Sequence, residues 1–306
     1  MTTEATDRAH ATPGPSDRLP LGPDSLTWRL FGDLRNLPLV LWAGILQNLH
    51  PTLDAAQLDH GKWRDNEYLE VVRLARSSGP ILTVVYETDD DADRAGATVR
   101  NYHNDLEGVR PDGKHYHALN PDSFYWAHAT FVMVPVVMAE NFGTPLTLEQ
   151  KRQLYLESKT WYARYGVGQR VMPEDWEAFE AYWDDTVCNV LALGDSHRTS
   201  AIVQGGSVYA PTGYVPPLPL IPRTAWRLLY EPLRRFFIFN ARATFPPHAR
   251  EIMGWEWTER DERRFRRYAR VLRAVFSVLP TRWHLFPQAR AAYRRANRLS
   301  ATSIWR

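Results

Sequence analysis

The spacing of apolar residues constrains the fold of this chain more than any other feature, because it follows the period of an α-helix in nearly every patterned segment. Residues 81–86 (Ile-Leu-Thr-Val-Val-Tyr) form the one run with the composition of a β-strand. Local signals mark several helix ends, including the capping box Thr147-Leu-Glu-Gln150. We therefore predict an all-α fold. The main predicted helices are residues 26–31, 39–49, 67–77, 93–107, 124–142, 148–165, 173–193 and 258–279.

Composition predicts how this helical chain is divided. Residues 1–20 are polar, contain three prolines and lack an apolar run, so we expect a disordered tail rather than a signal peptide. Residues 21–300 are predicted to form a single helical domain, interrupted by an irregular connection over residues 194–222, where glycine and proline cluster. No run of eighteen uninterrupted apolar residues is present, so we expect no transmembrane helix and a cytoplasmic location.

The charge of the chain is unevenly distributed. The net charge is only +2, yet residues 242–306 hold fifteen arginines and five acidic residues, a local excess of ten. Two interpretations remain open for this region, namely a set of solvent-facing helices and the binding of an anionic partner such as a membrane surface. Nucleic acid is not expected as a partner, because no nucleic-acid-binding motif accompanies the charge.

Cys188 is the only cysteine, so no disulfide can form within the chain. It lies in the segment Asp-Thr-Val-Cys-Asn-Val, whose apolar helical pattern predicts a buried and unreactive thiol.

Histidines and arginines recur within amphipathic segments between residues 47 and 128, where burial of a polar group is costly without a partner. Arg100 and His103 are three residues apart on one predicted helix, so their side chains should face the same way. An imidazole that ligates iron and a guanidinium that binds a propionate suit an iron porphyrin. From the spacing alone, a surface pair that binds nothing is the more common arrangement.

Arg73, Arg76 and Ser77 share one face of another predicted helix. They could form a polar wall that donates hydrogen bonds to dioxygen, or they could belong to a solvated helix end where arginine favours the helix dipole.

His128 lies in an apolar helical segment, where a lone histidine is more often a hydrogen-bonded core residue than a ligand. The alternative is a second contact to the haem or an alternative axial ligand. His115 and His117 could pass for a metal-binding pair, but no acidic or histidine partner follows at a recognisable spacing, which argues against a non-haem metal site.

In these motifs the chain resembles the catalytic-domain family of rubber oxygenase (latex clearing protein), which includes the fungal oxygenase of mycophenolic acid biosynthesis. The resemblance covers roughly residues 21–295, and it rests on the order and spacing of several short motifs. The motifs are Gln47…His50-Pro51, Asp59-His60, Arg73…Arg76-Ser77, Arg100…His103 and Trp126-Ala-His128-Ala-Thr130.

The resemblance implies an all-helical, globin-like core around a b-type haem, with additional N- and C-terminal helices. It also implies that His103, in an Arg-x-x-His motif, ligates the iron. The family's Arg-x-x-Lys-Thr motif corresponds here to Arg73, Arg76 and Ser77. Arginine replaces the lysine, and an arginine that is always protonated cannot ligate iron, so we expect no distal lysine ligand.

The expected function is that of a haem b-dependent oxygenase or oxidase, which uses dioxygen on a small lipophilic substrate such as an isoprenoid or another unsaturated natural product. His103 would hold the iron, Arg100 would bind a propionate, and Arg73, Arg76 and Ser77 would shape the dioxygen side. Two other functions remain open. One is a haem-binding sensor or carrier without turnover, and the other is a cofactor-free helical protein that binds an anionic partner.

Overall fold

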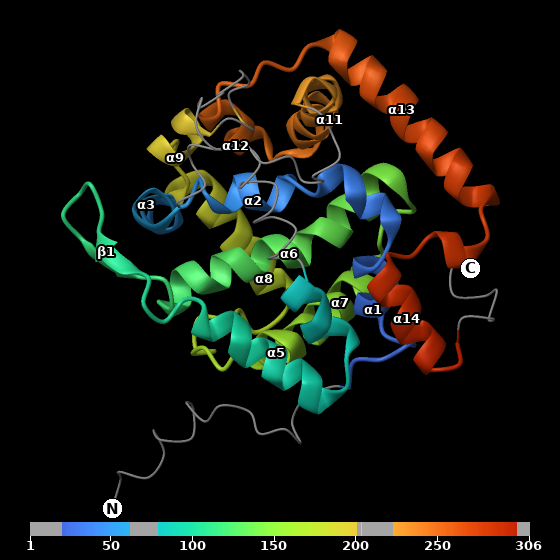
Figure 1. The fold of residues 1–306 in the computed structure, drawn as a ribbon, viewed down its shortest axis with the longest axis horizontal. Coiled ribbons are helices and arrows are strands. Elements are labelled where there is room, and N and C mark those ends of the chain that lie inside the picture. The colour runs from blue at the N-terminus through green and yellow to red at the C-terminus, as the bar shows by residue number, and fades with distance from the viewer. Residues whose placement is uncertain (1–19, 62–78, 201–202, 204–222, 299–306) are drawn as a thin grey trace, which may run out of the picture.

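A computed structural model of the protein describes residues 20–61, 79–200, 203 and 223–298 (Figure 1). Within these residues the chain is helical apart from loops and one short two-stranded sheet, so the predicted all-α fold is confirmed. The expected tail, the predicted helix over residues 67–77 and most of the expected irregular connection lie outside the described residues.

The first part of the chain forms short helices and one hairpin. Its helices are α1 (Leu26–Phe31), the 3-10 helix η3 (Leu34–Leu39), α2 (Trp42–Gln47), α3 (Pro51–His60) and α5 (Asp89–Asn101). The strands β1 (Glu107–Val109) and β2 (His115–His117) then pair antiparallel.

Longer helices follow the hairpin. They are α6 (Pro121–Phe142), α7 (Leu148–Ala163), α8 (Trp176–Asp185) with the π-helical turn η4 (Thr186–Val190), α9 (Asp195–Thr199), α11 (Arg223–Thr244), α12 (Pro247–Ile252), α13 (Glu259–Val278), the 3-10 turn η5 (Thr281–Trp283) and α14 (Pro287–Arg295). The short helix α9 therefore lies within the connection that was expected to be irregular.

Helix α6 is the centre of the fold and crosses the middle of the molecule in Figure 1. It packs against α1, α2, η3, α7 and α13. Its Trp126 is fully buried and contacts Trp183 of α8, whose ring stacks nearly parallel to Trp42 of α2 at a centroid distance of 6.1 Å. Large aromatic side chains thus fill the space where three helices meet.

The start of α1 is anchored by a buried carboxylate of α7. Glu157 accepts hydrogen bonds from the backbone amides of Leu26 and Thr27, at 3.1 and 2.7 Å, and from the Thr27 hydroxyl at 2.7 Å. These amides belong to the first turn of α1, which has no partner for them within the helix. A single carboxylate therefore satisfies the helix end and joins two helices that are far apart in the sequence.

Two predictions from local pattern are wrong. Residues 81–86 are helical rather than extended. Val84, Val85 and Tyr86 are fully buried, and the Tyr86 hydroxyl donates a 2.7 Å hydrogen bond to the Trp28 carbonyl. A short apolar run that is buried all round has no periodicity to distinguish helix from strand. Cys188, in turn, is exposed rather than buried, because it lies in the π-helical turn η4, where the periodicity of α8 is interrupted.

The hairpin is fixed to α3 through polar contacts. The Tyr116 hydroxyl donates to the Asp59 carboxylate at 2.6 Å, and His60 Nε2 donates to the Glu107 carbonyl at 3.1 Å. A side chain at Gly108, which pairs with Tyr116, would meet the Asp59 carboxylate at 2.7 Å. The hairpin thus requires glycine there, and its docking orders the chain that follows His103.

Candidate functional site

Arg100 and His103 lie at the C-terminal end of α5. The helix ends at Asn101, so His103 occupies the turn that follows it. The prediction that His103 lies within the helix is therefore wrong. The His103 amide still donates to the Arg100 carbonyl at 2.9 Å. The helix begins at Asp89, earlier than predicted, because three acidic residues in its first turn favour the N-terminal end of the helix dipole.

The imidazole of His103 is oriented by the helix that precedes it. Its Nδ1 lies 2.8 Å from the Val99 carbonyl oxygen, and since a carbonyl only accepts, Nδ1 carries the hydrogen. In the neutral ring Nε2 therefore holds the lone pair. The ring is half-buried and meets Phe124 of α6 edge to face at 5.7 Å. A backbone carbonyl that fixes the tautomer in this way is the usual support of a histidine that ligates a metal.

Arg100 is half-buried, and it forms no ion pair or hydrogen bond with the residues that the structure describes. Its guanidinium packs over Gly166, where an added Cβ would lie 2.6 Å from Nη1. Gly166 adopts φ +66°, a left-handed conformation that glycine tolerates best. A partly buried guanidinium without a carboxylate partner is suited to an anionic ligand.

Helix α5 is held firmly against the segment that follows α7. A Cβ at Gly96 would lie 2.2 Å from the Arg164 carbonyl oxygen, so the two backbones touch. The Arg164 side chain is buried; it donates to the Val84 carbonyl and pairs with Asp89 at the start of α5. The start and the middle of α5 are thereby fixed, which restricts where the C-terminal end with Arg100 and His103 can lie.

His128 lies deep in the aromatic core between α6 and α7. Its ring centroid is 4.2 Å from that of Trp161 and 4.8 Å from that of Tyr162. Neither ring nitrogen has a hydrogen-bond partner within the described part of the chain. Burial lowers the pKa of His128 to about 3, and the backbone of Ser158, at a geometry outside that of a normal hydrogen bond, opposes this effect in part. The expected burial is therefore observed, but the expected hydrogen bond is not.

The two histidines contact one aromatic cluster. His103 contacts Phe124, Phe124 packs on Tyr162 and Tyr165, and these two rings pack against His128. The sequence motifs around residues 100 and 128 are thus brought together by α6. Arg73, Arg76 and Ser77 lie outside the described residues. The roles expected for all six residues remain predictions.

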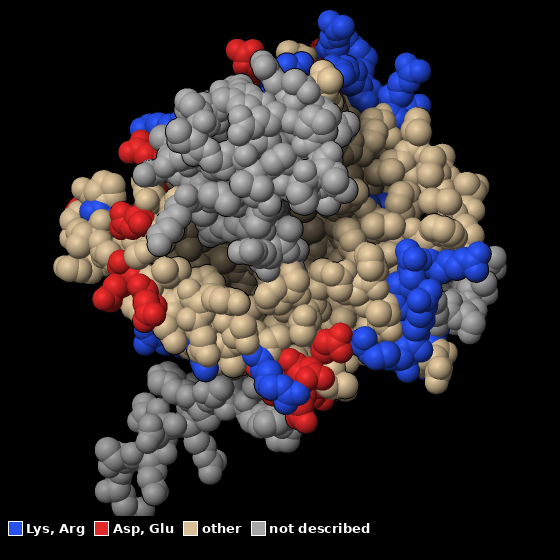
Figure 2. Space-filling view, in the orientation of Figure 1, with Lys and Arg blue, Asp and Glu red and all other residues tan. Residues whose placement is uncertain are grey.

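An apolar cavity of about 430 Å³ is lined by residues of α2, η3, α6 and α9. Figure 2 shows a hollow at the centre of this face of the molecule. Most of its lining is aliphatic or aromatic, including Leu41, Ile81, Leu82, Phe131 and Val134. Such a volume and such a lining are typical of sites for small lipophilic molecules.

Several polar groups line this cavity, and of these only Gln47 belongs to a motif noted in the sequence. His197 is buried, and its Nε2 donates to the Ile45 carbonyl at 2.8 Å. Burial lowers the pKa of His197, with a smaller opposing effect of that carbonyl. The preceding residue, Ser196, is held by the buried Asp54 carboxylate, which accepts from the Ser196 amide at 2.9 Å. The only sequence signal was the Asp-Ser-His triplet at residues 195–197, inside a segment predicted to be irregular.

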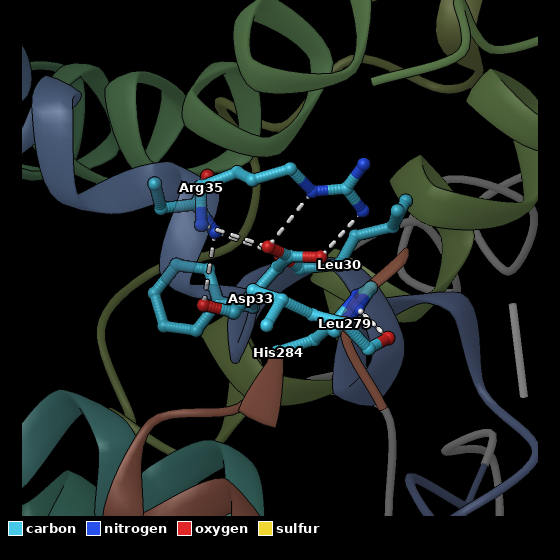
Figure 3. Close-up of polar contacts among 7 residues, drawn as sticks. Leu30, Asp33, Arg35, Leu279 and His284 are labelled. Atoms are coloured by element: carbon cyan, nitrogen blue, oxygen red, sulfur yellow. Dashed lines mark hydrogen bonds and ion pairs between the residues drawn. The ribbon is translucent and has the colours of Figure 1, made fainter. Parts of the chain in front are cut away.

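An ion pair between Arg35 and the buried Asp33 holds the start of η3, whose later residues line the cavity (Figure 3). The Asp33 carboxylate is fully buried and accepts from Arg35 through Nε at 3.0 Å and Nη2 at 2.6 Å. The Leu34 amide donates to the His284 carbonyl at 2.6 Å, and the Phe286 amide donates to the Gly32 carbonyl. These bonds join η3 to the segment before α14, and both segments line the cavity.

His115 and His117 of β2 do not converge on a site. His115 is exposed, and His117 donates from Nε2 to the Asn104 carbonyl at 2.9 Å. Among the described residues, no group of three or more His, Cys, Asp or Glu side chains is arranged to hold a metal ion. Likewise, no helix in the described ranges is long and apolar enough to cross a membrane.

The sequence matches the family described as "ER-bound oxygenase mpaB/B'/Rubber oxygenase, catalytic domain" over residues 28–274. This match spans most of the chain, so the protein belongs to that family and is an oxygenase-type oxidoreductase. No curated protein and no solved structure matches the chain.

Proposed function

We propose that the protein is a haem b-dependent oxygenase that acts on a small lipophilic substrate. The observation that carries the proposal is the orientation of His103, whose Nδ1 donates to the Val99 carbonyl and whose Nε2 holds the lone pair. A haem requires only one such protein ligand, in contrast to a multidentate metal site. When bound, the haem would supply the redox-active iron that dioxygen chemistry requires.

Arg100 fits the same cofactor. A haem carries two propionates, and a half-buried guanidinium without an ionic partner among the described residues can bind one of them. Gly166 leaves room for the guanidinium, because a side chain at position 166 would collide with it. His103 would thus bind the metal while Arg100 fixes the rotation of the macrocycle about that bond.

The cavity indicates the class of substrate. Its walls are apolar, and its volume of about 430 Å³ accommodates a small lipophilic molecule. We propose an isoprenoid or another unsaturated natural product, since burial of hydrocarbon against Leu41, Phe131 and Val134 would drive binding. Gln47 and His197 at the wall would orient any polar end of that molecule.

Arg73, Arg76 and Ser77 complete the proposal on the dioxygen side. Arginine cannot bind iron through nitrogen, so Arg76 would leave that side open to a small molecule, and it would donate hydrogen bonds there. His128, buried and without a hydrogen bond in the described part of the chain, is the alternative haem contact.

The test has two parts, and the first is haem binding. His103→Ala should abolish or strongly shift the Soret band of protein expressed with adequate haem. The matched control is His115→Ala, which removes an exposed histidine of β2 and should leave the band unchanged. Loss of haem in His128→Ala together with an unchanged His103→Ala spectrum would contradict the assignment.

The second part is turnover. The haem-loaded protein is incubated with unsaturated lipophilic compounds under ¹⁸O₂, and products are analysed by mass spectrometry. Incorporation of ¹⁸O that requires His103 supports the oxygenase. A haem protein without turnover on any such compound would instead be a sensor or carrier, and a protein without haem would be a cofactor-free helical protein. The expected cytoplasmic location also stays a proposal, which cell fractionation tests.

A further inference from the structure

Helix α13 lies at the rim of the molecule (Figure 1) and packs through only one face. Phe265 and Tyr268 on that face contact Phe142 of α6, and Tyr268 also contacts Phe236 of α11 at 5.8 Å. Most of the remaining residues of the helix are exposed. The helix therefore presents a long outer surface to its surroundings.

The outer surface of α13 is strongly basic. Seven exposed arginines lie in this one helix, at positions 260, 263, 264, 266, 267, 270 and 273, against three acidic residues in its first turn. Arg263 and Arg266 pair with Glu259 and Glu262. Arg260, Arg267 and Arg270 form no ion pair or hydrogen bond with the described residues. The excess positive charge is thus available to an external anion.

Exposed apolar side chains accompany the arginines in the C-terminal half of the same surface. Val271, Val278 and Trp283 are 57%, 81% and 54% exposed, and Val275 and Leu279 are also exposed. Figure 2 shows Lys and Arg at the N-terminal end of α13 and again over η5 and α14, with an uncharged stretch between them. We call this surface, the outer face of α13 together with residues 279–283, the α13–η5 edge.

The apolar part of this edge is held in a fixed position. His284 Nε2 donates to the Leu279 carbonyl at 3.0 Å, which closes the turn after α13 (Figure 3). The Arg290 guanidinium lies over the Trp283 ring at 5.8 Å. Val278 and Trp283 are therefore presented by an ordered turn, and burial of their side chains in a partner requires little further ordering.

We propose that the α13–η5 edge binds the surface of an anionic lipid membrane. Arginines of α13 would contact lipid phosphates, while Val278 and Trp283 would enter the interfacial layer, where tryptophan is favoured. Exposed valines would contribute little to the binding of nucleic acid, because proteins bind nucleic acid chiefly through charge. A second copy of the chain on this edge would bring arginine against arginine, which disfavours a dimer.

The α13–η5 edge is also connected through the chain to the wall of the apolar cavity. What this connection means for substrate supply rests on the proposed function. Phe286 and Gln288, which follow Trp283 closely in the chain, line the apolar cavity. A lipophilic substrate resides mostly in the bilayer, so an enzyme seated on the membrane by residues 278–283 would have its cavity wall close to that supply.

The experiment is co-sedimentation of the full chain with vesicles of phosphatidylcholine alone and of phosphatidylcholine with phosphatidylserine. We expect binding only to the anionic vesicles, with loss at high salt. The double variant Arg267→Glu, Arg270→Glu should weaken binding by about tenfold or more. Val278→Asp should also weaken it, at every salt concentration at which the wild type still binds. Circular dichroism melts establish that each variant folds.

Arg94→Glu is the matched control, because Arg94 is an exposed arginine of α5, on another side of the molecule in Figure 1. It should bind vesicles as the wild type does. Failure of the wild type to bind anionic vesicles, equal loss in Arg94→Glu, or a dimer that Val278→Asp dissociates would overturn the proposal. The haem spectrum should be the same in all variants, so this test and that of the proposed function fail separately.

Discussion

The buried His128 makes the stability of the protein depend on pH in a way that can be worked out. Burial lowers its pKa in the folded chain to about 3, whereas an unfolded histidine titrates near 6.5. Between these values the unfolded chain binds a proton that the folded chain does not. Stability is therefore complete above about pH 6.5 and is lost progressively as the pH falls toward 3. At about pH 5 the loss is roughly 2 kcal/mol, from about 1.5 units at 1.36 kcal/mol each.

The variant His128→Leu isolates this contribution. Leucine is similar in size and does not titrate, and the histidine makes no hydrogen bond with the described residues that would be lost. At about pH 8 the variant should be as stable as the wild type or more stable, since two unpaired buried nitrogen atoms are removed. Between about pH 8 and about pH 5 it should lose roughly 2 kcal/mol less than the wild type.

Urea unfolding at the two pH values, followed by circular dichroism, measures the difference. His50, whose pKa burial and the nearby Arg110 lower to about 4, is present in both proteins and cancels. His115→Leu serves as the control and should retain the pH dependence of the wild type, because His115 is exposed. Equal losses in the wild type and in His128→Leu would refute the account of a neutral histidine sealed in the core.

Two further predictions concern other parts of the fold. Glu157→Ala leaves the amides of Leu26 and Thr27 and the Thr27 hydroxyl without their buried acceptor, so the free energy of unfolding should fall by about 3 kcal/mol or more in urea titrations, whereas Glu149→Ala, a change in the exposed first turn of α7, should have little effect. Cys188 is exposed and should react with one equivalent of Ellman's reagent in the native protein; a thiol that reacts only after unfolding would contradict its position in η4.

Local signals predicted the helices that local interactions define. Helix α1 has the predicted bounds, with Ser25 as its N-cap, and the predicted capping box opens α7 through reciprocal bonds of Thr147 and Gln150. His50 also accepts from the Thr52 amide, as a residue before the N-terminal proline of a helix can. These features depend on residues within one turn of each other, so the sequence contains them directly.

Features set by contacts between distant residues could not be predicted. Residues 81–86 have the composition of a strand, but they form a helix. Val84 and Val85 are fully buried by residues that are distant in the sequence, and this packing stabilises the helix. His103 was assigned to a predicted helix over residues 93–107, whereas the helix ends at Asn101 and residues 107–109 form a strand whose Gly108 docks on Asp59. The cavity joins residues as distant as Leu41, Val134 and Phe286, and the spacing of no single segment indicates it.

The absorption spectrum and haem content of the purified wild-type chain, expressed with adequate haem, test the central claim most directly. The proposed function predicts a Soret band, a pyridine haemochrome of the b type and close to one haem per chain. A folded, colourless protein that lacks iron and does not acquire a Soret band on titration with haem would contradict the role of His103.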